Sequence, residues 1–433
     1  MSRLLIRNGR VVDPSQSLDQ GMDVLIEDGQ ISALSEKLEA PPRTNVFDAA
    51  GLVVAPGFID AHVHLREPGF EYKETIESGS RAAVAGGFTA VCCMPNTNPV
   101  NDEPSVTRFI KERAAQVDLA HVYPVGALSK GQAGTELAEI GEMVREGAVA
   151  VSDDGRPVMN AQLMRRALEY TRSFGVPVLA HEENIDLADG GSMHEGEVAS
   201  RIGLKGIPGA AEEVMVARDV LLSELTGGHV HLCHLSTRGS LELVRMAKRK
   251  ALTVTCEVTP HHFTLSDEDV ARSNYDPNWK MSPPLRSKAD VQAVLQAIYD
   301  GAVDAIVSDH APHHQDEKDL DFSEAPCGIV GLETSISLAL DRLVHGRVIG
   351  LLQLVRLMST SPAQIFRLPG GTLRQGAPAD VTILDLQSRV KVDPGNFRSL
   401  SRNTPYGGMK LKGAAVATVV GGRIAWQRKT TSR

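Results

Sequence analysis

Long apolar runs, redox motifs and excess positive charge are all missing from this sequence. No apolar stretch reaches the roughly 18 residues that a membrane-spanning helix requires, and the N-terminal residues run directly into a strand-like pattern. The five cysteines form no CxxC pair, and an odd number cannot all pair with one another, which fits reduced thiols. The formal charge of −9 argues against a surface for nucleic acid or for an anionic membrane. We therefore expect a cytoplasmic protein that has neither a membrane nor a nucleic acid as partner.

Strand-like segments occupy both ends of the chain. Residues 1–55 contain short apolar runs separated by Asn8-Gly9 and Asp28-Gly29, two pairs that favour hairpin turns. The same pattern of short apolar runs recurs after residue 368, for example in residues 380–384 and 415–420. We predict that residues 1–55 and 368–433 form one small discontinuous β domain. Two separate sheets would give the same pattern.

The intervening residues 56–367 alternate apolar runs with longer helix-like stretches, which is the pattern of βα units around a parallel sheet. Eight such units fit a TIM-type (β/α)8 barrel, the fold in which the active site lies at the C-terminal ends of the strands. The eight expected strands end near His64, Asn96, Gly126, Asp154, His181, His234, His261 and Asp309. The predicted fold class is therefore α/β, with a catalytic barrel over residues 56–367.

Histidines and acidic residues gather at these strand ends. His62 and His64 stand two apart on the first strand, so both imidazoles project from the same face. Later strand ends add further candidates, namely Asp153 or Asp154, His181, His234 and Asp309. His234 is preferred over His229 and His231 because it lies nearest the strand end. Four imidazoles and two carboxylates are too many for one tetrahedral ion and suit two divalent metals such as zinc. A metal pair lowers the pKa of water and polarises a carbonyl, which indicates attack on an amide or imide.

The motifs in this order are similar to those of one enzyme family. They are DAHVHLREPG (residues 60–69), GGFTAVCCMPNTN (86–98), SDDG (152–155), HEE (181–183), HLS (234–236), PPLR (283–286) and SDHAPH (308–313). Together they resemble the longer bacterial type of dihydroorotase, in the amidohydrolase superfamily. The similarity spans nearly the whole chain, and the REPG and MPNT segments are the part most specific to dihydroorotase.

The resemblance implies a zinc site with two ions per subunit. His62 and His64 would bind the first zinc, and His181 and His234 would bind the second. Many relatives bridge their metals with a carboxylated lysine after the fourth strand. This chain has Asp153-Asp154 there, and the match to the subgroup with a bridging aspartate selects Asp154, together with a hydroxide. Asp309 would be a zinc ligand and the catalytic proton shuttle.

The resemblance also implies the substrate contacts. Arg66 and Asn96 would hold the substrate carboxylate, because a guanidinium fork binds a carboxylate through two parallel hydrogen bonds. The remaining expected contacts are His64, His313 and the backbone of Cys327 and Gly328. Ser282 stands where the family usually has Asn, and a hydroxyl cannot present an amide donor and acceptor together. The departure concerns substrate affinity more than the chemistry.

The implied activity is the reversible cyclisation of N-carbamoyl-L-aspartate to L-dihydroorotate in the synthesis of UMP. Two alternatives stay open at this point. One is a cyclic amide hydrolase of the hydantoinase or allantoinase type, and the other is a non-catalytic subunit that scaffolds aspartate transcarbamoylase. The relatives imply a homodimer or a complex with aspartate transcarbamoylase as the possible assembly. The charged residues 314–325 are expected to form a solvated loop that could act as a lid.

Overall fold

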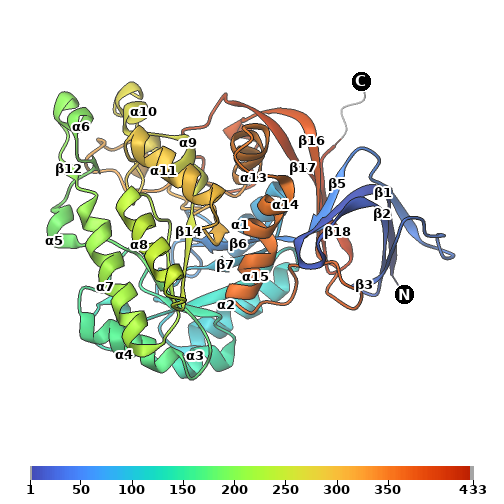
Figure 1. Cartoon of the computed structure of the whole chain (residues 1–433), viewed down its shortest axis with the longest axis horizontal. Coiled ribbons are helices and arrows are strands. Elements are labelled where there is room, and N and C mark those ends of the chain that lie inside the picture. The colour runs from blue at the N-terminus through green and yellow to red at the C-terminus, as the bar shows by residue number, and fades with distance from the viewer. Residues whose placement is uncertain (1, 430–433) are drawn as a thin grey trace.

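The computed structural model describes residues 2–429 and joins the two ends of the chain in a single sheet (Figure 1). The strand order is β18-β17-β16-β5-β1-β2-β3, and β4 pairs with β1. The strands are β1 (Arg3–Asp13), β2 (Leu18–Glu27), β3 (Gln30–Ser35), β4 (Asn45–Asp48), β5 (Val53–Pro56), β16 (Val381–Lys391), β17 (Lys410–Val420) and β18 (Arg423–Gln427). The predicted discontinuous β domain is confirmed, and the alternative of two separate sheets is wrong. We propose that its boundaries lie at residues 55 and 368.

The hairpin predicted at Asn8-Gly9 is wrong. Strand β1 runs through this pair, and its register against β2 shifts between Ile6 and Gly9, which is a β-bulge. Gly9 is required there because a Cβ atom would lie 2.5 Å from Cγ2 of Val54 on the neighbouring strand. The pair Asp28-Gly29, in contrast, does turn the chain between β2 and β3, with φ angles of 47° and 81°.

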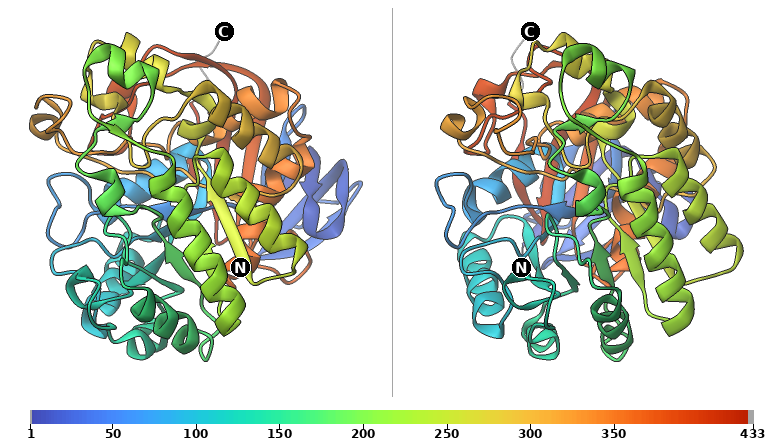
Figure 2. Two further views of the ribbon diagram at one scale, coloured as in Figure 1. Left: turned by 60° about the vertical axis from the view of Figure 1, so that its left-hand side comes forward. Right: turned by 90° about the vertical axis from the view of Figure 1, so that its left-hand side faces the viewer.

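The second large sheet is a parallel barrel in the order β15-β14-β13-β10-β9-β8-β7-β6 (Figure 2). Its strands are β6 (Phe58–Val63), β7 (Phe88–Cys93), β8 (His121–Ala127), β9 (Ala150–Ser152), β10 (Val178–Ala180), β13 (Val230–Leu232), β14 (Val254–Val258) and β15 (Ala305–Ile306). A parallel bridge between Val63 and His310 brings the two edges together. Each predicted strand end lies within about three residues of the end of an observed strand, so the predicted barrel is confirmed.

Helices cover the outside of the barrel. They include α1 (Ile76–Gly86), α2 (Pro104–Val117), α3 (Ile140–Glu146), α4 (Ala161–Thr171), α7 (Ala210–Thr226), α8 (Arg238–Arg249), α11 (Lys288–Tyr299), α13 (Ser335–Ala339), α14 (Leu351–Val355) and α15 (Ser361–Ile365). Helix α1 begins after Thr75, whose hydroxyl accepts a hydrogen bond from the Ser78 amide, and it ends at Gly87 with a φ of 104°. The helices and strands enclose one large apolar core. Among the described residues, none of the helices combines the length and the apolar character needed to cross a bilayer.

Shorter elements follow the C-terminal ends of the barrel strands. They are α5 (Ile185–Ala188), β11 (Met193–His194), α6 (Glu197–Ile202), β12 (Gly206–Ile207), α9 (Pro260–Thr264), α10 (Asp267–Arg272) and α12 (Gln315–Lys318). Helix α12 lies inside the segment 314–325, which was expected to be a solvated loop. Lys73 Nζ lies 2.7 Å from Glu317 Oε1, and Lys318 Nζ donates to the carbonyl of Pro326. The segment is thus held by an ion pair to the loop that contains Lys73 and by a hydrogen bond to its own neighbour Pro326. A lid motion stays a prediction.

Candidate metal centre and active site

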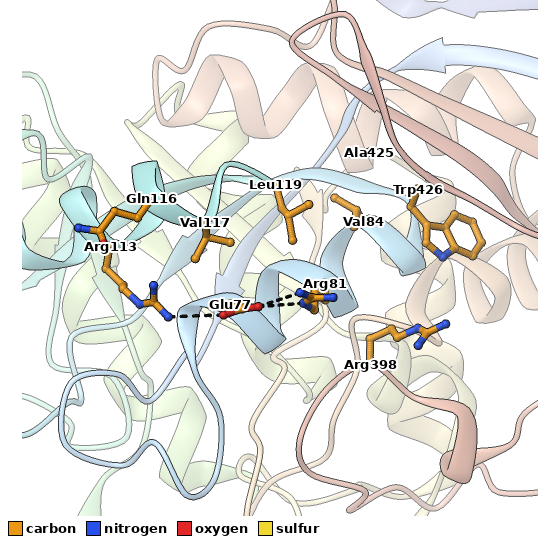
Figure 3. Close-up of a pocket in the computed structure, with 10 residues that line it drawn as sticks. All are labelled: Glu77, Arg81, Val84, Arg113, Gln116, Val117, Leu119, Arg398, Ala425 and Trp426. Atoms are coloured by element: carbon orange, nitrogen blue, oxygen red, sulfur yellow. Dashed lines mark hydrogen bonds and ion pairs between the residues drawn. The ribbon is translucent and has the colours of Figure 1, made fainter.

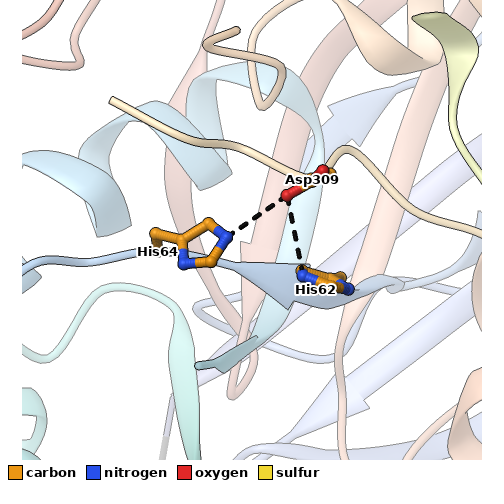
Figure 4. Close-up of side chains that lie close together, drawn as sticks. All are labelled: His62, His64 and Asp309. Carbon is orange, nitrogen blue, oxygen red and sulfur yellow. Dashed lines mark hydrogen bonds and ion pairs between the residues drawn. The ribbon is translucent and has the colours of Figure 1, made fainter. Parts of the chain in front are cut away.

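Strand β6 delivers the first two histidines of the site. His62 is on the strand and His64 follows it, and both side chains point toward Asp309, which follows β15 (Figure 4). His64 Nε2 lies 3.2 Å from Asp309 Oδ1, and His62 Nε2 lies 3.6 Å from the same oxygen. The alternation along the strand therefore brings both rings to the same carboxylate, as the spacing predicted.

Asp154 lies at the centre of the cluster. It follows β9, and its carboxylate oxygens are 3.4 Å from His62 Nε2 and 3.5 Å from His64 Nε2. The same carboxylate is 3.5 Å from His181 Nδ1 and 3.4 Å from His234 Nε2. One carboxylate thus faces all four histidines. Its neighbour Asp153 points elsewhere and accepts hydrogen bonds from the backbone amides of Leu128 and Ser129.

The second pair of histidines comes from the ends of β10 and β13. His181 Nδ1 and His234 Nε2 are 3.1 Å apart, and both rings are buried. The two other histidines near β13 lie outside this cluster. His229 and His231 both contact the hydroxyl of Thr255. Of these three histidines, His234 is the one beside Asp154, and its role as a metal ligand stays a prediction.

The donor atoms of the cluster fit a metal ion. His62 Nδ1 donates to Glu257 Oε1 over 2.7 Å, which leaves the lone pair of Nε2 facing the two aspartates. This buried Nε2 has no hydrogen-bond partner among the described residues. Three groups have ligand atoms within 4.8 Å of one another. They are His62, His64 and Asp309; His62, Asp154 and His234; and His62, Cys233 and Glu257. Imidazole and carboxylate are the ligands that divalent transition metals take in proteins.

The electrostatics of the cluster favour bound positive charge. Burial works to raise the pKa of Asp154, but His62, His181 and His234 overcome it and hold that pKa well below its usual range. Burial likewise opposes charge on His62, yet the adjacent Asp154 and Asp309 raise the pKa of His62 well above its usual value. The carboxylates are therefore ionised and attract cations. A metal ion supplies that positive charge and leaves the histidines neutral.

Three residues of the site have a left-handed backbone. The φ angles are 63° at Arg66, 34° at His234 and 46° at Asp309. This region is unfavourable for residues with a Cβ atom, and such strain is concentrated at functional sites. Each of the three residues follows a barrel strand, where the strained turn aims its side chain across the rim.

A cavity of about 380 Å³ opens beside the cluster. Arg66 lies in its wall, where its Nε donates to the carbonyl of Pro312 and its Nη2 lies 3.4 Å from His313 Nε2. The guanidinium forms no ion pair with a carboxylate among the described residues, so its remaining N–H groups are left for a ligand. Burial lowers the pKa of Arg66 to about 10, so the side chain is charged at neutral pH. Asn96 lines the same wall, and its Oδ1 accepts from His64 Nδ1 over 2.9 Å. The amide nitrogen of Asn96 has no partner among the described residues and is a free donor.

The same cavity is lined by Ser282, His313, Cys327 and Gly328, which together with His64 complete the predicted substrate contacts. His313 Nε2 donates to the carbonyl of Cys327 over 2.9 Å, and burial next to Arg66 lowers the pKa of His313, so the ring is neutral. The amide of Gly328 donates to the carbonyl of Lys280. Among these backbone donors, the Cys327 amide is therefore the one left for a ligand.

Two acidic residues of this site escaped the sequence reasoning. Glu257 on β14 accepts from His62 Nδ1 and, over 3.0 Å, from His231 Nε2. A fully buried glutamate within an apolar strand was the signal that could have pointed to it. Glu183 lines the cavity, and its carboxylate lies 3.9 Å from His181 Nε2. It stood in the HEE motif, where only the histidine was assigned a role.

Comparison with known proteins gives the family. The Dihydro-orotase-like model matches residues 51–240, and the Amidohydrolase family model matches residues 331–425. A dihydroorotase of Anaeromyxobacter dehalogenans (strain 2CP-C) is 53% identical over 430 residues, which cover 99% of both chains. A dihydroorotase of Geobacter metallireducens is 51% identical over 425 residues, which cover 98% of this chain and all of the relative. The chain belongs to the dihydroorotase family.

Solved structures place the family in the wider amidohydrolase fold. The L-hydantoinase from Arthrobacter aurescens superimposes with a TM-score of 0.89 at 26% identity and covers all of this chain, which covers 98% of that protein. The D-hydantoinase from Thermus sp. gives a TM-score of 0.82 at 27% identity, with 98% and 95% coverage. The protein is thus a hydrolase of cyclic amide C–N bonds. Its fold family is typically metal-dependent, and its histidine–aspartate cluster offers candidate ligands.

Proposed function

We propose that this protein is a zinc-dependent enzyme that reversibly closes N-carbamoyl-L-aspartate to L-dihydroorotate, in cytoplasmic UMP synthesis. The observation that carries the proposal is the convergence of four histidines on Asp154, next to a cavity that contains a guanidinium paired with no carboxylate of the described residues. The first feature suits hydrolysis of an amide. The second suits a substrate that bears a carboxylate.

Two zinc ions fit the available donors. His62, His64 and Asp309 would hold one ion, His181 and His234 would hold the other, and Asp154 faces both sets. When bound, such a pair supplies a Lewis acid for the amide carbonyl and lowers the pKa of water towards neutrality. Glu257 fixes the tautomer of His62, and Asn96 fixes that of His64, so that each ring presents Nε2.

Asp309 is the proposed proton carrier. Nearby His62 and His64 outweigh the effect of burial and hold the pKa of Asp309 below its usual range, so that it starts as the base. In the hydrolytic direction it takes a proton from the attacking water and delivers it to the ring nitrogen as the C–N bond breaks. In the cyclising direction the same carboxylate accepts the proton of that nitrogen.

Arg66 and Asn96 orient the substrate. The free N–H groups of Arg66 form a fork that can bind one carboxylate through two hydrogen bonds, and the Asn96 amide can donate a third. Cys327 lines the same cavity, and its backbone amide would bind the ring. This arrangement distinguishes a ring that carries a carboxylate from a plain hydantoin, which gives Arg66 no anionic partner.

The experiment compares L-dihydroorotate with hydantoin as substrates of the purified protein, with Asp309→Asn as control. We expect turnover of dihydroorotate alone, and loss of turnover in the variant even at saturating zinc. Preferential turnover of hydantoin would support the cyclic amide alternative. Zinc binding without turnover of either compound would contradict the proposed activity and point to a scaffolding subunit.

We also propose that the chain self-associates or joins aspartate transcarbamoylase, as its resemblance to dihydroorotases implies. Helix α7 supports this, because Val214, Leu221 and Leu225 lie on one face of it and are 44%, 61% and 64% exposed. Light scattering of the chain, alone and mixed with the transcarbamoylase, measures the mass. The mass of a monomer for the chain alone, with no increase when the transcarbamoylase is added, would contradict both assemblies.

A further inference from the structure

A second hollow region lies where the barrel meets the C-terminal strands. Two cavities of about 480 and 490 Å³ share Arg398 and Trp426 in their walls. Figure 3 shows the first of them, with Val84, Val117 and Leu119 above and the guanidinium of Arg398 below the indole of Trp426. We call the two cavities together the Trp426 groove. Its walls share no residue with the cavity beside Asp154.

In the first cavity, every charged residue other than Arg398 is paired within the protein. Glu77 on α1 forms ion pairs with Arg81, at 2.8 Å, and with Arg113 on α2, at 3.6 Å (Figure 3). Arg113 also contacts Glu67 at 3.2 Å. These two arginines are therefore committed to protein carboxylates, and this part of the groove presents its apolar side chains.

The second cavity contains cations with no such partner. Arg389 and Lys391 are two apart on β16 and lie on the same face of the strand, and Arg398 follows in the next loop. Within residues 2–429, no group accepts a hydrogen bond from these three side chains or forms an ion pair with them. Three uncompensated positive charges at one cavity stand out in a chain whose formal charge is −9.

The acidic residues of the same wall are already occupied. Asp393 accepts from the Gly395 amide and from Asn396 Nδ2. Glu333 accepts from the amides of Arg398 and Ser399, and burial raises its pKa to about 7, so that it is partly neutral near physiological pH. Neither carboxylate neutralises the three cations, which leaves an attractive field for an anion.

We propose that the Trp426 groove binds a phosphorylated compound with a planar ring, of the nucleoside monophosphate class. The phosphate would lie on Arg398, Arg389 and Lys391, because guanidinium and ammonium groups bind phosphate oxygens through charge-assisted hydrogen bonds. The ring would stack on the half-buried indole of Trp426. Each cavity has the size of a small-molecule site. The walls contain neither histidine nor cysteine, so the groove binds this ligand without reacting with it.

The test uses Trp426 as its own reporter. The sequence has two tryptophans, so Trp279→Phe leaves Trp426 as the sole indole. Adenosine monophosphate is titrated into this variant and its fluorescence is followed, and calorimetry on the unmodified chain gives a second readout. We expect saturable quenching by adenosine monophosphate, and at least tenfold weaker binding of adenosine and of inorganic phosphate. The purine probe is chosen because it differs from the pyrimidine ring expected at the active site.

Matched variants locate the binding. Arg398→Ala, and separately the double change Arg389→Ala with Lys391→Ala, should each weaken binding at least tenfold. Arg423→Ala should leave it unchanged, because Arg423 is on the same strand as Trp426 but pairs with Asp118 at 2.6 Å outside the groove. Thermal unfolding checks that each variant is folded. Absence of saturable binding, equal binding by Arg398→Ala, or equal binding of inorganic phosphate and nucleotide would overturn the proposal, and none of these results bears on dihydroorotate turnover.

Discussion

Replacing Glu257 with Gln tests how the centre is held, because Glu257 touches no proposed substrate atom. Its carboxylate accepts from His62 Nδ1 at 2.7 Å and from His231 Nε2 at 3.0 Å, and all three side chains are fully buried. An amide keeps one acceptor oxygen and removes the charge, so one of these two hydrogen bonds is lost or reversed. A hydrogen bond to a charged group contributes about 1.5–3 kcal/mol. Groups that orient a ligating histidine typically change metal affinity or activity about 10–100-fold.

We therefore expect Glu257→Gln to weaken zinc binding and to lower kcat/KM for L-dihydroorotate, each by about 10–100-fold. Competition with a chelator measures the zinc affinity. Initial rates at saturating zinc show whether activity is lost because zinc dissociates or because the His62 imidazole is misplaced. Asp304→Asn is the matched control, since Asp304 precedes β15 but pairs with Lys248 at 2.7 Å and contacts no histidine. Zinc affinity and kcat/KM within twofold of the unmodified protein would refute the reasoning, as would an equal loss in Asp304→Asn.

Three further changes test other parts of the molecule. Arg66→Lys should lower kcat/KM about 100-fold with zinc content unchanged, because an ammonium cannot form the two-bonded fork; an unchanged rate would exclude Arg66 as the carboxylate contact. Ser282→Asn should lower KM by about 3–10-fold through one added hydrogen bond worth about 1 kcal/mol, and a raised KM would contradict it. The pKa of Glu333 is raised from 4.5 to about 7 by burial, so the folded state binds its proton more tightly and stability falls as the pH rises between these values. Denaturant titrations should show that the free energy of unfolding of Glu333→Gln, relative to that of the unmodified protein, is about 2–3 kcal/mol more favourable at pH 8 than at pH 5. The same pH dependence in both proteins would contradict this.

The site histidines were predictable because the barrel converts sequence order into position. Every parallel strand ends at the same rim, so a polar residue after each apolar run had to lie near the others. The period of two on β6 placed His62 and His64 on one side without further information. His234 was preferred over His229 and His231 because it lies nearest the strand end, and its Nε2 lies 3.4 Å from Asp154 in the structure.

The features that sequence reasoning missed depend on contacts between distant segments. Glu257 meets His62 because β14 and β6 lie on one barrel, and no local pattern shows that contact. Gly328 offers no free amide because Lys280, in another loop, takes it. Asn8-Gly9 carries a strong local turn signal, but the close approach of Val54 turns it into a bulge within a continuous strand. In each case tertiary pairing decided the outcome over local preference.

Zinc titration into the metal-free protein, with L-dihydroorotate hydrolysis followed at each step, tests the proposed centre most directly. We predict no turnover without metal, and full turnover at about two zinc ions per chain, as expected when two sites share Asp154. Asp154→Asn should lower the zinc bound per chain, because this carboxylate faces all four histidines. Full turnover in the absence of metal, or two bound zinc ions with no turnover, would contradict the proposed function.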